Sequence, residues 1–165
     1  WYKDAGVKYL SIHDLLKKYI EEGTIKLDKS IHHELTTYHD PCNYARKSEI
    51  VFGHGYYEEP RWVLQQCCEN FVEMYPNRAN NHCCGAGGGA WAAPYIEERI
   101  FYGRAKAKQI KDTGAKMVVA PCHNCRDMIM KSLRKEYDFM KVEVKYLWEL
   151  VADSLVLEPP EGEEE

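Results

Sequence analysis

The sequence lacks any apolar run long enough to cross a bilayer. Its longest apolar runs, such as MVVA at 117–120, fall far short of the roughly 20 residues that a membrane-spanning helix needs. No charged-then-apolar leader opens the chain, so neither membrane insertion nor export is expected. The seven cysteines are an odd number, which argues against a secreted protein held by paired disulfides. We therefore expect a reducing, cytoplasmic setting in which cysteines serve chemistry or metal binding.

The sequence is also not basic overall. The net charge of −4 becomes +1 when the acidic end LEPPEGEEE is set aside, so no basic face suggests nucleic acid as a partner. We expect residues 158–165 to form a disordered acidic tail. Residues 1–157 are expected to form one domain, since 45% apolar and 12% aromatic residues can build a core. Because the sequence begins without an initiator methionine, we interpret it as a piece of a longer protein.

Strands and helices are predicted to alternate along the chain. Such alternation is typical of an α/β fold with a parallel sheet and helices on both faces, a Rossmann-like three-layer arrangement. The expected strands are LTTYHD (35–40), FVEMY (71–75), AKMVVA (115–120) and KVEVKY (141–146). The expected helices run from Ser11 to Gly23, from Pro60 along the stripe Leu64, Cys67, Cys68 and Phe71, from Pro94 to Gly114, from about His123, and through 147–155.

Five of the cysteines follow a pattern that points to one site. Cys42 follows the first expected strand and Cys122 follows the third, so both should lie at the carboxyl edge of the sheet, where ligands bind in such folds. Three loops would then bring five thiols together. These are Cys42, Cys83, Cys84, Cys122 and Cys125.

The adjacent pair Cys83 and Cys84 indicates the kind of metal centre. Neighbouring side chains point apart and suit one tetrahedral zinc ion poorly, whereas each can bind a different corner of a multi-iron cluster. The glycines that follow, Gly85, Gly87, Gly88 and Gly89, would let bare backbone approach such a cluster and donate N–H groups to it. Two alternatives stay open. One is a zinc-stabilised interaction domain, and the other is a metal-free thiol oxidoreductase that uses the C-x-x-C pair at 122–125.

Three motifs together resemble a known family. HDPCNYAR (39–46), CCGAGGG (83–89) and APCHNC (120–125) are similar to the cysteine-rich CCG domain of the B-type subunit of heterodisulfide reductase and its relatives. The flanking stretches EEPRWVLQQCCENFVEMYPNR and VEVKYLWELVADSL most resemble the C-terminal part of DsrK, from the membrane-associated DsrMKJOP complex. The resemblance covers roughly residues 9–157.

The resemblance implies a non-cubane [4Fe–4S] cluster held by the same five cysteines, which would reduce a disulfide with electrons passed singly. A DsrC-like protein with a disulfide or trisulfide would be the partner, beside other subunits that keep the protein peripheral to the membrane. The ferredoxin-type C-x₂-C-x₂-C-x₃-C-P repeats of DsrK are missing from the sequence. The chain is thus expected to hold a catalytic centre without its electron supply.

Four polar residues near the motifs have two interpretations each. His39 could be a proton donor or hydrogen-bond partner near Cys42, or a loop histidine bonded to backbone. Arg46 could neutralise cluster charge or guide an anionic partner, or form a surface salt bridge. His82 and His123 could tune the cluster, or simply be exposed.

Two further patterns are interpreted as structural. Cys67 and Cys68 form a second doublet, but no glycine follows it, so we expect two buried small apolar side chains. The stretch GAGGGA (85–90) fits the dinucleotide pattern G-x-G-x-x-A. It does not follow a strand directly, and we reject that interpretation.

Overall fold

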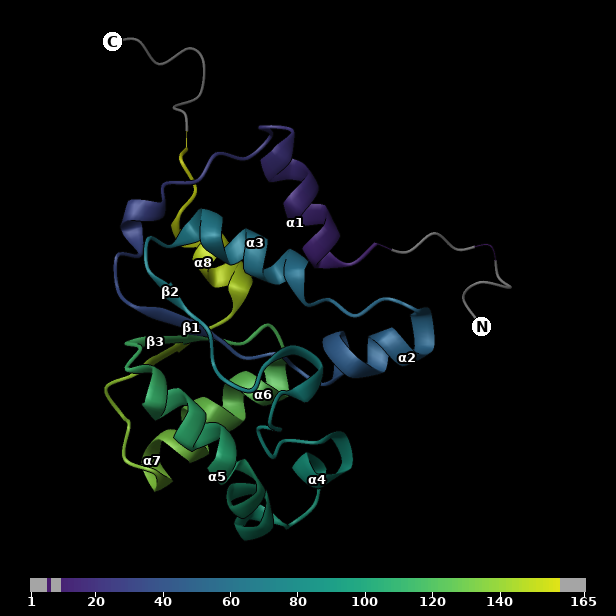
Figure 1. The fold of residues 1–165 in the computed structure, drawn as a ribbon, viewed down its shortest axis with the longest axis vertical. Coiled ribbons are helices and arrows are strands. Elements are labelled where there is room, and N and C mark those ends of the chain that lie inside the picture. The colour runs from purple at the N-terminus through teal and green to yellow at the C-terminus, as the bar shows by residue number, and fades with distance from the viewer. Residues whose placement is uncertain (1–5, 7–9, 158–165) are drawn as a thin grey trace.

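The sheet of this protein has four parallel strands (Figure 1). The structure is a computed structural model, and it describes residue 6 and residues 10–157. The strands are β1 (Thr36–Tyr38), β2 (Phe71–Val72), β3 (Met117–Val119) and β4 (Glu143–Lys145), in the order β2-β1-β3-β4. Tyr38 pairs with Val119, and Val119 pairs with Lys145. The three longer strands therefore end at the same level, and the loops that follow them start side by side.

Helices and short turns connect the strands. The α-helices are α1 (Ile12–Glu21), α2 (Ser48–Phe52), α3 (Glu58–Cys67), α4 (Gly88–Ala92), α5 (Ile96–Thr113), α6 (His123–Asp127), α7 (Arg134–Glu136) and α8 (Leu147–Asp153). Two π-helical segments are η2 (Asn43–Lys47) and η4 (Met128–Leu133). Two short 3₁₀ helices are η1 (Lys29–Ile31) and η3 (Arg78–Asn80).

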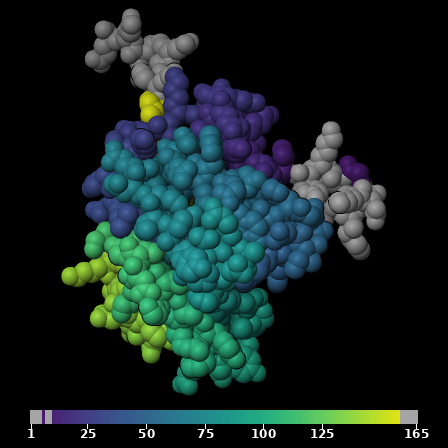
Figure 2. All heavy atoms as spheres, in the orientation of Figure 1, coloured from purple at the N-terminus to yellow at the C-terminus, as the bar shows by residue number. Residues whose placement is uncertain are grey.

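Two helical layers cover the sheet. Met117 and Val119 of β3 face α3 and α8, whereas Val118 between them faces α5 and η4, as the two-residue period of a strand requires. In Figure 1, α1, α3 and α8 lie on one side of the strands, and α5, α6 and α7 lie on the other. Teal residues span the middle of this view in the space-filling picture (Figure 2). The expected three-layer α/β fold is confirmed.

Local chemistry fixes the helix ends as expected. The Ser11 side chain accepts a hydrogen bond from the backbone N–H of His13 at 3.2 Å, which caps α1. Gly114 ends α5 in the left-handed conformation at φ +67°, where a residue with a Cβ would be strained. The periodic apolar residues and the caps thus specify the same elements.

Several expected boundaries were wrong by a few residues. The strand expected at 71–75 stops at Val72, because the chain turns so that Glu73 pairs with Arg61. The helix expected to open at Pro60 begins at Glu58 and ends at Cys67. The helix expected to open at Pro94 begins at Ile96. Ile96, which was expected on the apolar face of that helix, is 56% exposed. The last helix ends at Asp153.

The acidic tail expected at 158–165 lies outside the described residues. Within residue 6 and residues 10–157, no helix combines the length and the apolar character that a bilayer crossing requires.

The packing of α3 gives a direct stability test. Leu64 is fully buried between α3 and the sheet, so Leu64→Ala removes apolar contacts and leaves a cavity. We expect the free energy of unfolding to fall by about 2–5 kcal/mol, measured by urea denaturation. Ile50→Ala is the matched control, since the Ile50 side chain is 82% exposed, and its change should stay within about 0.5 kcal/mol. Equal losses in both variants would contradict the assigned core.

Candidate metal centre

Three loops at the carboxyl edge of the sheet carry the five cysteines. Cys42 directly precedes η2 in the loop after β1, and Cys122 directly precedes α6 in the loop after β3. Cys125 lies one turn into α6. The pair Cys83 and Cys84 lies between η3 and α4, on the long connection from β2 to α5. The expectation that Cys42 and Cys122 arrive at one edge is met, because β1 and β3 are neighbours in register.

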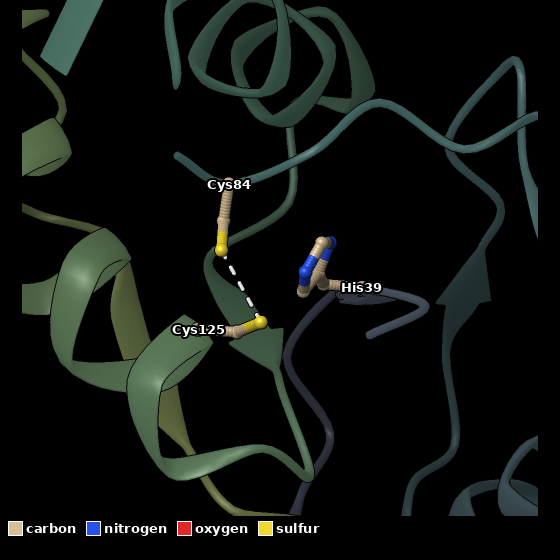
Figure 3. Close-up of side chains that lie close together, drawn as sticks. All are labelled: His39, Cys84 and Cys125. Carbon is tan, nitrogen blue, oxygen red and sulfur yellow. Dashed lines mark hydrogen bonds between the residues drawn. The ribbon is translucent and has the colours of Figure 1, made fainter. Parts of the chain in front are cut away.

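The innermost part of this edge is a compact group of three side chains. The sulfurs of Cys84 and Cys125 lie 3.2 Å apart, and a ring nitrogen of His39 lies within 4.8 Å of both (Figure 3). All three residues are buried. The sequence allows His39 to be a neighbour of Cys42 or a backbone-bonded loop residue. Its ring points toward Cys84 and Cys125 and interacts electrostatically with Cys84, and neither ring nitrogen bonds to the backbone of the described residues.

The other three thiols surround this group more loosely. The Cys83 side chain is exposed, and its sulfur accepts a hydrogen bond from the Gly85 backbone N–H at 3.3 Å. Cys42 and Cys122 are half-buried. Cys42 interacts electrostatically with Cys83, and Cys122 interacts with Cys125 and Cys84. Each of the five thiols is thus linked to another member of the set.

Crowding makes the protonation of these thiols interdependent. Hydrogen bonds from Cys125 and Cys83 hold the pKa of Cys84 well below its usual range. Hydrogen bonds from Cys125 and from backbone N–H groups lower the pKa of Cys122 to about 6, despite burial. The same contacts raise the pKa values of the two donors, Cys83 and Cys125. Without a cation among them, only part of the set ionises, because like charges this close repel.

A single zinc ion and a multi-iron cluster make different demands on the spacing of sulfurs. A tetrahedral zinc site has Zn–S bonds of about 2.3 Å, which bring all its sulfurs to within about 4 Å of one another. Among the described residues, the compact group of donors holds two sulfurs and one imidazole, namely Cys84, Cys125 and His39, within 4.8 Å of one another. Thiolates from several loops are the kind of donor that an iron–sulfur cluster uses.

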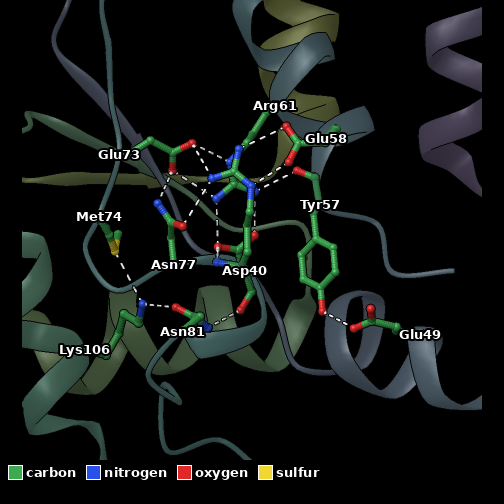
Figure 4. A network of polar contacts seen from close by, with 11 residues as sticks. Asp40, Glu49, Tyr57, Glu58, Arg61, Glu73, Met74, Asn77, Asn81 and Lys106 are labelled. Atoms are coloured by element: carbon green, nitrogen blue, oxygen red, sulfur yellow. Dashed lines mark hydrogen bonds and ion pairs between the residues drawn. The ribbon is translucent and has the colours of Figure 1, made fainter.

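A buried ion pair joins two of the cysteine loops. Arg61 binds both carboxylate oxygens of Asp40, at 2.6 and 2.8 Å, and also binds Glu73 at 2.6 Å (Figure 4). The Asp40 carboxylate accepts a further bond from the backbone N–H of Arg78 at 2.8 Å, and the Asp40 carbonyl accepts one from the Asn81 side chain. Burial opposes ionisation of Asp40, but the contacts with Arg61 prevail and lower its pKa. The loop that carries Cys42 is thereby fixed to the segment before Cys83.

Arg46 strengthens the same connection. Its Nη1 donates to the carbonyl oxygens of Ala79 and Asn81, each at 2.9 Å. This contact is neither of the expected alternatives, a charge facing the cluster or a surface salt bridge. Arg46 instead ties the segment after Cys42 to the backbone just before the cysteine pair.

Lys106 is a buried cation that the sequence analysis missed. It lies on α5 and is fully buried, and its Nζ contacts the side-chain oxygen of Asn81 and the Met74 sulfur. A lysine three residues after Gly103 and four before Ile110, both buried on α5, is the signal that could have revealed it. Burial lowers the pKa of Lys106 to about 8.

Glycine has a different role in each half of the CCGAGGG motif. Gly85 has φ +87°, and a Cβ there would lie 2.2 Å from the carbonyl oxygen of Arg99 on α5. The missing side chain of Gly85 thus lets this loop pack on a helix, in addition to the N–H that it gives Cys83. Gly87, Gly88 and Gly89 are exposed, and a Cβ on any of them would meet open space. The surface beside Cys83 is therefore unobstructed by the described residues.

The remaining expected residues lie farther from the inner group. His82 is exposed. His123 is also exposed, and its ring contacts the Tyr146 hydroxyl and lies 3.7 Å from Asp127. Cys67 and Cys68 are buried in the core with α3, and burial raises the pKa values of both thiols, to about 12 and about 11. Their interpretation as small apolar side chains is confirmed.

Comparison with known proteins agrees with this geometry. The family model described as "CCG: Cysteine-rich domain" matches residues 36–130, which include all five cysteines of the site. This chain belongs to the CCG cysteine-rich domain family.

Curated relatives share about a third of its residues. The Hdr-like menaquinol oxidoreductase iron-sulfur subunit of Archaeoglobus profundus is 32% identical over 90% of this chain and 27% of its own length. One subunit of the dihydromethanophenazine:CoB–CoM heterodisulfide reductase of Methanosarcina acetivorans is 32% identical over 94% of this chain and 36% of its own length. The EtfAB:quinone oxidoreductase of Syntrophomonas wolfei is 30% identical over 81% and 19%. The chain therefore spans about a third or less of these relatives.

The two roles of glycine can be separated by one substitution each. Gly85→Ala places a methyl group against the Arg99 carbonyl and forces alanine to a positive φ, so the free energy of unfolding should fall by at least about 2 kcal/mol. Gly87→Ala, from the same motif, meets no atom within 4 Å and should change stability by less than about 1 kcal/mol. Urea denaturation of the metal-free proteins measures both. A Gly85→Ala variant as stable as the wild type would disprove the close approach to α5.

Proposed function

We propose that this chain is an iron–sulfur electron-transfer module of an oxidoreductase, with its cluster held by Cys42, Cys83, Cys84, Cys122 and Cys125. The observation that supports the proposal is the contact between the sulfurs of Cys84 and Cys125, which lie 3.2 Å apart although they come from different loops. Cys42 and Cys122 lie in the loops after the neighbouring strands β1 and β3, and Cys83 adjoins Cys84. Family membership and the similarity to relatives named as iron-sulfur subunits and oxidoreductases support the same chemistry. A [4Fe–4S] cluster of non-cubane form is the specific proposal.

The protein's own residues have distinct tasks in this function. A bound cluster supplies one-electron transfer and iron sites to which sulfur can bind. Cys84 and Cys125 would be its buried ligands, and His39 and the surrounding core exclude water there. Cys83 would be an exposed ligand, and the Gly85 N–H, which donates to the Cys83 sulfur, would stabilise negative charge on it. The Asp40–Arg61 pair and Arg46 keep the loops of Cys42 and Cys83 at a fixed separation.

A disulfide is the substrate we propose for this module. The exposed Cys83 and the unobstructed glycines 87–89 leave room for a flexible segment that carries sulfur to approach the centre. A heterodisulfide reductase contributes one of the relatives, which supports reduction of a sulfur–sulfur bond. We propose a DsrC-like protein disulfide or trisulfide as substrate and a DsrK-like position in a complex peripheral to the membrane, on the resemblance of residues 39–46, 83–89 and 120–125 and their flanks.

A quinone-linked electron relay is the second candidate. Two of the relatives are named as menaquinol or quinone oxidoreductases. In a relay the module would pass electrons between other centres of a longer protein, and no disulfide would bind at Cys83.

The five-cysteine assignment predicts the metal content of variants. Protein purified without oxygen should contain iron and acid-labile sulfide in equal amounts. Cys83→Ser and Cys84→Ser should each lose the visible absorption, because each removes a ligand. Cys67→Ala and Cys68→Ala are the matched controls from the second doublet, and they should keep it.

A different metal and sulfide content would identify one of the two alternatives. Zinc without sulfide, after anaerobic reconstitution has been attempted, would support a structural zinc domain. Neither zinc nor iron would favour a metal-free thiol oxidoreductase, for which the low pKa of Cys122 makes it the attacking thiolate. Absorption that survives Cys83→Ser and Cys84→Ser together would disprove the site assignment.

The substrate is tested with the full subunit that contains this chain. Reduced methyl viologen supplies electrons, and a DsrC-like protein with its two C-terminal cysteines as a disulfide is the acceptor. Two electrons and two protons should convert each disulfide into two thiols, counted by alkylation and mass spectrometry. The Cys84→Ser subunit is the control for direct reduction by the dye. A cluster-loaded subunit that exchanges electrons with a menaquinone analogue, and releases no thiols above the control, would favour the relay.

A further inference from the structure

Lys106 is a buried ammonium group whose two contacts lie near the cysteine pair. Asn81 is two residues before Cys83, and Met74 packs in the same core cluster as Cys84 and Cys125. Lys106 is 0% exposed, and its Nζ lies 3.5 Å from the Met74 sulfur and contacts the side-chain oxygen of Asn81 (Figure 4). Both partners are neutral. Among the described residues, no carboxylate oxygen lies within 4 Å of the Lys106 Nζ, so the group has no ion-pair partner there. A charged group taken out of water without an anion is strongly unfavourable, so its surroundings must supply negative charge.

The candidates for that negative charge are few. Asp40, Cys84, Cys125 and Cys83 all interact attractively with Lys106 in their ionised forms. The Asp40 carboxylate is already bound through both oxygens by Arg61, whose charge offsets it. Other arginines near these loops, among the described residues, are engaged elsewhere. Arg46 donates to two backbone carbonyls and Arg78 pairs with Glu58, whereas Arg99 and Arg126 stack on the rings of Trp91 and Tyr146.

We propose that Lys106 is the resident cation of the metal centre, which balances the negative charge of the thiolate set and raises the reduction potential of the group held there. The inference rests on the proposed iron–sulfur function and adds a charge-setting residue to it. Five thiolates give the centre a net negative charge, and each electron that enters adds one more. A fixed ammonium nearby favours the reduced state, because its attraction grows by one unit of charge on reduction.

The state of Lys106 agrees with this role. Its pKa, lowered by burial to about 8, still leaves the group mainly charged at pH 7. The low polarity of the site makes its charge act at greater strength than on the surface. Reduction by one electron breaks no bond and needs no proton from Lys106, so the group keeps its charge in both states.

The α5 helix provides a matched control two residues along. Lys108 is exposed and pairs with Asp112 at 2.7 Å. Its charge is screened by water and by its partner. Lys108→Met removes the same charge from the chain as Lys106→Met, and it should leave the centre unaffected.

The test is a redox titration of the cluster-loaded full chain, followed by electron paramagnetic resonance and visible absorption, with dithionite as reductant and ferricyanide as oxidant. Lys106→Met should shift the equilibrium between oxidised and reduced centre at least about tenfold toward the oxidised form, which is about 59 mV lower in potential. Lys106→Arg should stay near the wild type. Asn81→Asp places a carboxylate next to Lys106 and should shift the potential in the same direction as Lys106→Met. It serves as the test if Lys106→Met does not fold.

The outcomes separate this inference from the function on which it rests. If the cluster-loaded Lys106→Met variant has the same reduction potential as the wild type, the role of Lys106 is overturned and the cluster assignment stands. If Lys106→Met does not fold, an unchanged potential in Asn81→Asp leads to the same conclusion. An equal shift in Lys108→Met also overturns it, since the effect would then be one of overall charge. A wild type without iron and sulfide overturns both.

Discussion

The site depends on one buried ion pair, between Asp40 at the end of β1 and Arg61 on α3. Both side chains are almost completely buried and the pair is bidentate, so removal of Arg61 would leave the Asp40 carboxylate without a cation, whereas Arg61 has a second carboxylate partner in Glu73. Asp40 also accepts the backbone N–H of Arg78, and its carbonyl accepts the Asn81 amide. The distance between the first cysteine loop and the cysteine pair is therefore set by a contact that involves no cysteine.

Around this pair, ionisable groups replace the apolar side chains that normally fill a sheet edge. Lys106 and the group of His39, Cys84 and Cys125 are all buried. Their charge states depend on one another, since the attraction between Lys106 and the thiolates opposes the burial that lowers the pKa of Lys106. A region of this composition is poorly stabilised by packing alone, and a polyvalent centre bound there, as proposed, would add to its stability.

Much of the fold and part of the site could be predicted from the sequence. Short apolar strands, caps such as Ser11 and Gly114, and the positions of Cys42 and Cys122 after strands all depend on local chemistry. The helical spacing could have shown that Lys106 is buried, but neither its contacts nor the packing of Gly85 on α5 could be predicted locally, because both depend on α5 meeting residues 74–85. The shortened β2 has the same origin, since Glu73 turns toward Arg61. Family membership follows from the motifs, whereas a position among DsrK-like subunits remains a prediction.

The cysteines of this domain are spread over more than half of its length, and no single loop carries more than two of them. A compact ligand motif can bind metal while the rest of a chain is still being made. Here the loop of Cys42 meets that of Cys122 only after β3 has inserted beside β1, a parallel pairing that needs the whole intervening segment. A centre bound by all five cysteines, as proposed, would consequently form only after most of the domain has been translated and folded, at an assembled surface and not on a nascent peptide.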